Sequence, residues 1–130
     1  MKTIKQKVKF KASPNEIYEM LMDSKKHSGF TGSKAKISRE VGGKISAYDG
    51  WIEGKNLVLK QDKKIVQRWR GKDWPKEHYS KAIFALRKDK KEGTALDFTQ
   101  TNVPEKYYKL IKDGWKEHYW QKMKKFLRER

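Results

Sequence analysis

The chain has 130 residues, enough for one hydrophobic core, so we expect a single domain over residues 1–130. Its 33 Lys and Arg residues against 16 Asp and Glu residues give a formal net charge of +17. The lack of cysteine excludes a disulfide framework, a cysteine zinc site and a thiol nucleophile. Trp, Tyr and Met supply large apolar side chains that disordered chains lack, which predicts a folded domain with a lysine-rich surface.

No part of the sequence approaches the roughly 18 consecutive apolar residues that a membrane-spanning helix needs. The first residues alternate lysine with apolar side chains instead of forming the apolar core of a signal peptide. These features predict a cytoplasmic protein without a membrane span.

The N-terminal segment has the alternation of a half-buried strand, with Ile4, Val8 and Phe10 on the face that also carries Gln6. A helix is predicted to begin after Ser13, because Ser-Pro-Asn-Glu combines an N-cap serine, a proline at the first helical position and a glutamate suited to a capping box. A second short helix is expected after Asp23. The sequence thus predicts one strand followed by two short helices.

Glycine pairs and charged turns separate short β-type segments in the middle of the chain, which is typical of a meandering antiparallel sheet. The expected strands are 35–40, 44–48, 51–60, 65–70, 79–87 and 94–100. After Pro104, aromatic and aliphatic residues recur at spacings of three and four, which predicts one long amphipathic helix. The fold class is therefore α+β with a helix-grip layout, in which a curved antiparallel sheet of six to seven strands wraps the C-terminal helix.

Several short segments in this order resemble one known family, the activator of heat-shock protein 90 ATPase homologues, within the SRPBCC or START-like superfamily. The resemblance covers nearly the whole chain and is carried by Ala12-Ser13-Pro14, Phe30-Thr31-Gly32, Val41-Gly42-Gly43-Lys44, Ile65-Val66-Gln67-Arg68-Trp69-Arg70, Val103-Pro104, Gly114-Trp115 and Tyr119-Trp120.

The resemblance implies a helix-grip fold of the START or birch-pollen-allergen type, with a cavity under the C-terminal helix. In the eukaryotic activators, this domain follows an N-terminal domain with an NxNNWHW-type motif that the present sequence does not contain. The resemblance itself implies a chaperone or another acidic protein as a partner, whereas the missing N-terminal motif argues against a strong ATPase-activating role.

We expect the cavity to bind a small hydrophobic or amphipathic ligand, because large aromatic residues and two amides share the predicted inner faces of the sheet and helix. A buried amide needs a polar partner, and for Gln67 and Gln100 this is either a ligand or another protein group. The candidate ligand-binding residues are Phe30, Trp51, Gln67, Trp69, Phe84, Phe98, Gln100, Trp115, His118 and Tyr119.

Other functions have weaker support in the sequence. The three histidines lie in separate elements without zinc-ligand spacing, so no metal and no cofactor are expected. No catalytic residue stands out, although a cyclase-like or hydrolase-like enzyme using the same cavity stays an alternative. The lysines are spread over the whole chain, so nucleic-acid binding through the basic surface is the less favoured reading.

Overall fold

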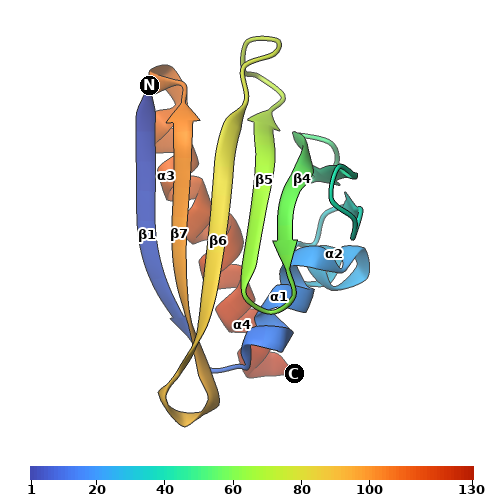
Figure 1. Ribbon diagram of the computed structural model, residues 1–130, viewed down its shortest axis with the longest axis vertical. Helices are drawn as coiled ribbons and strands as arrows, with labels where there is room; N and C mark the ends of the chain where they lie inside the picture. Colours follow the sequence, from blue (N-terminus) through green and yellow to red (C-terminus); the bar gives the residue numbers. More distant parts are fainter.

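The computed structural model describes the backbone of residues 1–130 and every side chain except that of Lys91. Seven antiparallel strands form one curved sheet in the order β1-β7-β6-β5-β4-β3-β2. Behind the sheet, a long C-terminal helix runs diagonally across its inner face, and two short helices lie beside the end of that helix (Figure 1). The strands are β1 Lys2–Phe10, β2 Lys36–Ile37, β3 Lys44–Ala47, β4 Ile52–Lys60, β5 Lys64–Gly71, β6 Ser80–Asp89 and β7 Gly93–Val103.

The N-terminal elements follow the sequence prediction. On β1, Ile4, Val8 and Phe10 are buried while the intervening lysines are exposed. Helix α1 (Pro14–Met22) begins where the cap was expected, since the Ser13 side chain accepts a hydrogen bond from the Glu16 amide at 3.2 Å. The Glu16 carboxylate does not complete the capping box, because it pairs with Arg130 at the C-terminus at 2.8 Å.

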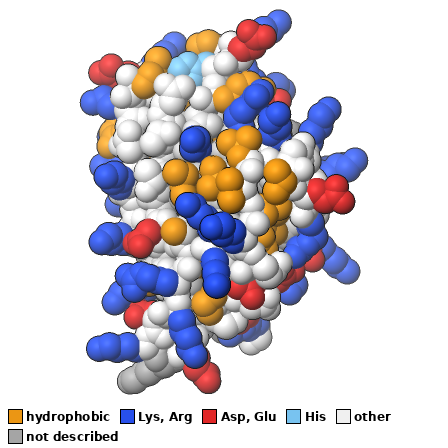
Figure 2. Space-filling model, in the orientation of Figure 1, with side chains coloured by type: hydrophobic (Ala, Val, Ile, Leu, Met, Phe, Trp, Pro, Cys, Tyr) orange, Lys and Arg blue, Asp and Glu red, His pale blue; other side chains and the backbone are white. Residues whose placement is uncertain are grey.

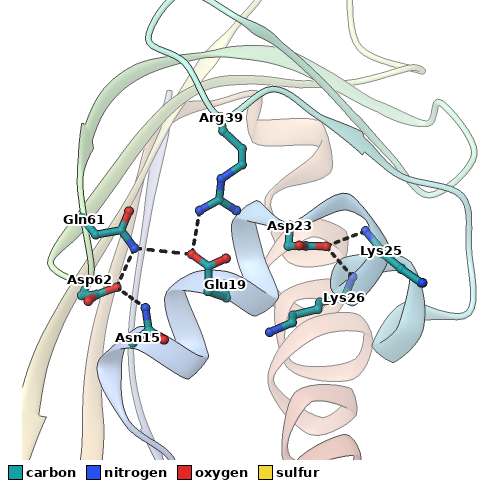
Figure 3. A network of polar contacts seen from close by, with 8 residues as sticks. All are labelled: Asn15, Glu19, Asp23, Lys25, Lys26, Arg39, Gln61 and Asp62. Carbon is teal, nitrogen blue, oxygen red and sulfur yellow. Dashed lines mark hydrogen bonds and ion pairs between the residues drawn. The ribbon is translucent and has the colours of Figure 1, made fainter.

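Helix α2 (Ser24–Thr31) is capped by Asp23. Figure 3 shows this cap beside a polar network that ties α1 to the sheet. Glu19 on α1 accepts hydrogen bonds from Arg39 at 2.7 Å and from Gln61 at 3.4 Å, so it links the loop after β2 with the turn after β4. The carboxylates of Glu19 and Asp62 therefore accept hydrogen bonds that fix α1 against the neighbouring loops.

Two elements differ from the sequence prediction. The segment expected as a strand over 35–40 pairs only over β2, because the carbonyls of Ser38 and Glu40 accept hydrogen bonds from the buried Asn56 amide instead. The C-terminal helix begins with a 3₁₀ turn, Glu105–Tyr107, and consists of α3 (Tyr108–Trp115), a π-helical segment (Lys116–Trp120) and α4 (Gln121–Glu129). The long helix is thus confirmed, with a π-helical turn near its middle.

One continuous apolar core joins the inner face of the sheet, α1, α2 and the C-terminal helix. The helix contributes six buried side chains, those of Ile111, Trp115, Tyr119, Trp120, Met123 and Leu127. By contrast, Leu110 and Phe126, which have the same helical spacing in the sequence, are 61% and 37% exposed.

Candidate functional site

Aromatic rings fill the space between the sheet and the C-terminal helix. The ring of Trp115 lies 4.4 Å from that of Phe98, 5.7 Å from that of Phe84 and 5.6 Å from that of Trp69, measured between centroids. An internal void of about 20 Å³ is left beside them. A void of this size has room for about one water molecule, so a ligand larger than water does not fit there without displacing core side chains.

Gln100 lies at the centre of this core and is fully buried. Its Oε1 atom accepts a hydrogen bond from Trp115 Nε1 at 2.7 Å, and its Nε2 donates to Ser80 Oγ at 2.8 Å. The Ser80 hydroxyl in turn donates to the Trp69 carbonyl at 2.8 Å. The amide thus bonds to the helix on one side and to the sheet on the other.

The Gln67 amide also has a protein partner. Its Nε2 donates a hydrogen bond to Asn56 Oδ1 at 3.2 Å. Asn56 Nδ2 in turn donates to the carbonyls of Ser38 and Glu40, after β2. For both glutamines, the intramolecular hydrogen bonds considered as the alternative to a ligand contact are present.

The π-helical segment turns Tyr119 toward α2. Its hydroxyl lies 2.9 Å from Nε2 of His27, and both side chains are buried. Burial lowers the pKa of His27 from 6.5 to about 4 and raises that of Tyr119 well above 10. His27 is therefore neutral at physiological pH, and its buried Nδ1 has no partner among the described side chains.

An open groove of about 820 Å³ lies at the side of this core, between α3 and the strand ends at β3, β4 and β5. We call it the lateral groove. Aromatic and aliphatic side chains make up most of its surface, principally Tyr48, Trp51, Trp69, Leu110, Trp115 and Tyr119.

The β3–β4 turn sets one wall of the lateral groove. Tyr48, Asp49 and Gly50 all have positive φ angles, and the Asp49 carboxylate accepts a hydrogen bond from the Lys34 amide at 2.9 Å, so the turn is held in an uncommon conformation. At one end of the groove the Tyr48 hydroxyl donates to the His118 carbonyl. At the other end Trp51 Nε1 donates to Asp73 Oδ2 at 3.2 Å.

The structure distributes the ten candidate residues among three environments. Trp51, Trp69, Trp115, His118 and Tyr119 line the lateral groove. Gln67 and Phe84 border the small internal void, together with Trp69, Trp115 and Tyr119. Phe30, Phe98 and Gln100 line neither space; Phe30 packs against His27 and Tyr119 at centroid distances of 5.0 and 5.8 Å.

The sequence analysis did not single out Leu110, Gly114 and Tyr48 for the groove. Leu110, Gly114 and His118 follow one another at intervals of four and so share one stripe of the helix. The sequence contained a signal for the groove, namely that Leu110 and Gly114 share a helical stripe with His118. It was missed because Leu110 also fits the apolar periodicity after Pro104, which predicts a buried position.

The outer face of the sheet is strongly basic. Its three central rows, read across the strand register, contain seven cationic side chains and one acidic one, Asp97. The middle row of the three contains the aliphatic residues Ile83, Val66 and Val58, side by side on β6, β5 and β4. Figure 2 shows this face, with hydrophobic side chains gathered centrally and Lys and Arg around them. The cations are Lys5, Lys7, Lys55, Lys60, Lys64, Arg68 and Lys81.

These seven cations lack acidic partners in the part of the chain whose side chains are described, since none is in an ion pair. Asp97 is paired with Arg87 at 3.8 Å. The outer face therefore combines an aliphatic centre with unneutralised positive charge.

Two kinds of site are not found among the described residues. No group of three His, Asp or Glu side chains is placed to hold a metal ion. No described helix is long and apolar enough to cross a membrane.

Comparison of the sequence with known protein families identifies the family of this chain. Residues 11–128 match the sequence model of the family described as "Activator of Hsp90 ATPase homolog 1-like protein". The chain belongs to this family. The resemblance noted from the sequence motifs is thereby confirmed.

Curated members of the family are longer than this chain. The Dictyostelium discoideum protein named "Activator of 90 kDa heat shock protein ATPase homolog" is 34% identical over 95% of this chain and 32% of its own length. The Homo sapiens protein named "Activator of 90 kDa heat shock protein ATPase homolog 1" is 29% identical over 88% of this chain and 34% of its own length. The chain thus spans about a third of these relatives.

Solved structures support the helix-grip fold. A Plasmodium falciparum protein described as an HSP90 activator has a TM-score of 0.90 and 25% identity, with 96% of this chain and 95% of that chain covered. A Mesorhizobium loti protein has a TM-score of 0.84 at 17% identity, with 98% of both chains covered. The α+β helix-grip prediction is confirmed.

Proposed function

We propose that this chain is a non-enzymatic, co-chaperone-like domain that binds an Hsp90-type chaperone in the cytoplasm. The observation that carries the proposal is the outer face of the sheet, with seven unpaired cations around an aliphatic centre. The names of the curated relatives support the choice of partner. The filled interior directs attention to this surface rather than to an internal cavity.

The chemistry of the outer face favours an acidic protein surface as its partner. Unpaired lysines accelerate the encounter with an acidic partner and set its orientation. Val58 is 38% exposed at the β4 end of the row that also contains Val66 and Ile83, where an apolar side chain of the partner can replace water. This combination of an apolar centre and a charged rim is the usual composition of a protein–protein interface.

Nucleic acid fits this face less well. Stacking of bases requires exposed aromatic rings, whereas the centre of the outer face is aliphatic. The ring of Tyr79, which directly precedes β6, is covered on one side by the Arg68 guanidinium, 3.9 Å from its centroid. Non-specific nucleic-acid binding in the range of about 10⁻⁴ to 10⁻⁶ M at physiological salt is expected from charge alone.

The proposal is tested with two charge-matched double variants and a purified Hsp90-type chaperone. Lys60→Glu/Lys81→Glu reverses two exposed cations of the outer face, and Lys124→Glu/Lys125→Glu makes the same change on α4. By titration calorimetry we expect the first pair to weaken binding by about tenfold or more and the second pair to leave it nearly unchanged.

Equal weakening by both variants would assign the attraction to net charge alone. No binding by the unmodified chain, or sub-micromolar sequence-dependent binding to nucleic acid, would overturn the proposal.

A second candidate function is the binding of a small hydrophobic or amphipathic ligand, and the lateral groove favours it. The groove's volume of about 820 Å³ lies within the usual range of about 300–1,000 Å³ for small-molecule sites. Five of the candidate ligand-binding residues line it. The predicted ligand site is therefore proposed beside the core rather than inside it.

A further inference from the structure

The charges around the lateral groove differ from those of the rest of the molecule. Three carboxylates line it, those of Asp73, Asp113 and Glu117, while Lys109 is the lysine in its lining. Lys109 is already paired, because its Nζ lies 2.7 Å from Asp113 Oδ2. In a chain with a net charge of +17, the lining of the groove thus has more acidic than basic side chains, while Lys112 and Lys116 near Asp113 and Lys122 over the Tyr48 ring lie just outside it.

These carboxylates come from both walls of the groove. Asp113 and Glu117 lie four residues apart, on the last turn of α3 and the first turn of the π-helical segment. Asp73 lies in the loop after β5, where its carboxylate is held by the Trp51 indole. Because Asp113 is paired with Lys109, a bound cation would be attracted mainly by Asp73 on one wall and Glu117 on the other, which are in no ion pair among the described side chains.

The apolar part of the groove is suited to the body of such a cation. The indoles of Trp51 and Trp69 meet edge to face, with ring centroids 6.3 Å apart, beside the Asp73 carboxylate. Aromatic faces attract organic cations through the ring quadrupole, most strongly in tryptophan. A charged head at the Asp73 end and an apolar body along Leu110 and Trp115 would match the lining.

A helical glycine leaves the groove open. A Cβ atom added at Gly114 would meet no side chain closer than His118, at 3.8 Å. Glycine inside a helix is about 1 kcal/mol less favourable than alanine. Its presence beside the groove therefore maintains free volume at some cost in helix stability.

We propose that the lateral groove binds an amphipathic organic cation, with its ammonium group near Asp73 and its apolar body along α3. This inference rests on the second candidate function, ligand binding in the groove, and adds the chemical class of the ligand. The overall positive charge of the chain would favour an anion, so a preference for a cation has to come from the local carboxylates.

The test uses three probes with the same apolar body, a phenyl ring and four methylenes: 4-phenylbutylammonium, 4-phenylbutan-1-ol and 5-phenylpentanoate. Their affinities are measured by titration of the ¹⁵N-labelled chain, with the indole N–H signals of Trp51 and Trp69 as reporters. We expect the ammonium to bind at least about tenfold more tightly than the alcohol, and the carboxylate more weakly than either.

Two variants separate the charge contribution from the apolar one. Asp73→Asn retains a hydrogen-bond acceptor for the Trp51 indole, and it should lower the affinity for the ammonium while that for the alcohol stays unchanged. Glu129→Gln, at the end of α4, removes an equal charge remote from the groove and should change neither. Gly114→Met should occupy the part of the groove beside Leu110 and weaken binding of all three probes by at least about tenfold while the chain stays folded.

The possible failures are distinguishable. Equal affinity for alcohol and ammonium, or tighter binding of the carboxylate, would overturn the cation inference and leave ligand binding in place. No response of either indole signal to any probe would overturn both. Affinities that are unchanged by Gly114→Met would show that the apolar body does not lie along α3 and would overturn the inference as well.

Discussion

Replacement of Gln100 by leucine tests whether the polar groups under the C-terminal helix are satisfied by one another. In Gln100→Leu, the buried Trp115 indole N–H loses its acceptor, and Ser80 keeps its own bond to the Trp69 carbonyl. A buried donor left without a partner costs about 1–3 kcal/mol, so we expect the free energy of unfolding to fall by about 2 kcal/mol.

A double-mutant cycle isolates this hydrogen bond from the change in packing. Trp115→Phe alone removes the donor and also part of the ring's packing. In combination with Gln100→Leu, the loss should be about 1–2 kcal/mol smaller than the two single losses added, because the double variant removes both the indole donor and its amide acceptor and so leaves neither unsatisfied. Urea unfolding followed by far-ultraviolet circular dichroism gives all four free energies without relying on tryptophan emission.

Thr94 provides the matched control for this cycle. Its buried hydroxyl donates to the Ala12 carbonyl at 2.7 Å, six residues along β7 from Gln100. Thr94→Val should therefore be additive with Trp115→Phe. Additivity of Gln100→Leu with Trp115→Phe as well would refute the reasoning and make the Gln100 amide available to a ligand.

Three further predictions concern the core. Trp69→Ala should destabilise the chain by about 3–5 kcal/mol, as for a packed aromatic residue, since Trp69 is 3% exposed, and a loss below about 1 kcal/mol in urea unfolding would show an open pocket instead. The free energy of unfolding should decrease as the pH falls from 6.5 to about 4, by up to roughly 1.4 kcal/mol per pH unit, because the unfolded chain binds a proton at His27 that the folded chain excludes. A His27→Gln variant whose free energy of unfolding depends on pH with the same slope would refute this. A chain ending at residue 103 should show no cooperative thermal transition, because burial of a helix side chain is worth about 1.5–3 kcal/mol and six of the removed residues are buried core; a cooperative transition would contradict the helix-grip account.

Local sequence patterns were sufficient for most of the fold. The alternation of β1 and the cap at Ser13 each depend on neighbouring residues, and both are found as predicted. The π-helical turn was missed because the periodicity of the aromatic residues is nearly the same with or without it. The adjacent pair Tyr119 and Trp120, both buried, was the available signal, since neighbouring positions on a regular α-helix point about 100° apart.

The candidate site was less predictable than the fold. Alternation correctly indicates that Gln67 and Gln100 point inward, but their partners, Asn56 and Ser80, lie on other strands and depend on register. Whether a curved sheet encloses a cavity depends on how rings from separate elements meet. The contact of Phe98 with Trp115 at 4.4 Å, which fills the centre, has no counterpart in local sequence.

The central claim, that the outer face of the sheet contacts the chaperone, is tested most directly by mapping backbone amide signals of the ¹⁵N-labelled chain during titration with an Hsp90-type chaperone. The account predicts that signals of outer-face residues such as Val66, Arg68 and Ile83 broaden or shift first. Changes confined to the lateral groove, at Leu110 and Gly114, or no changes at all, would contradict it.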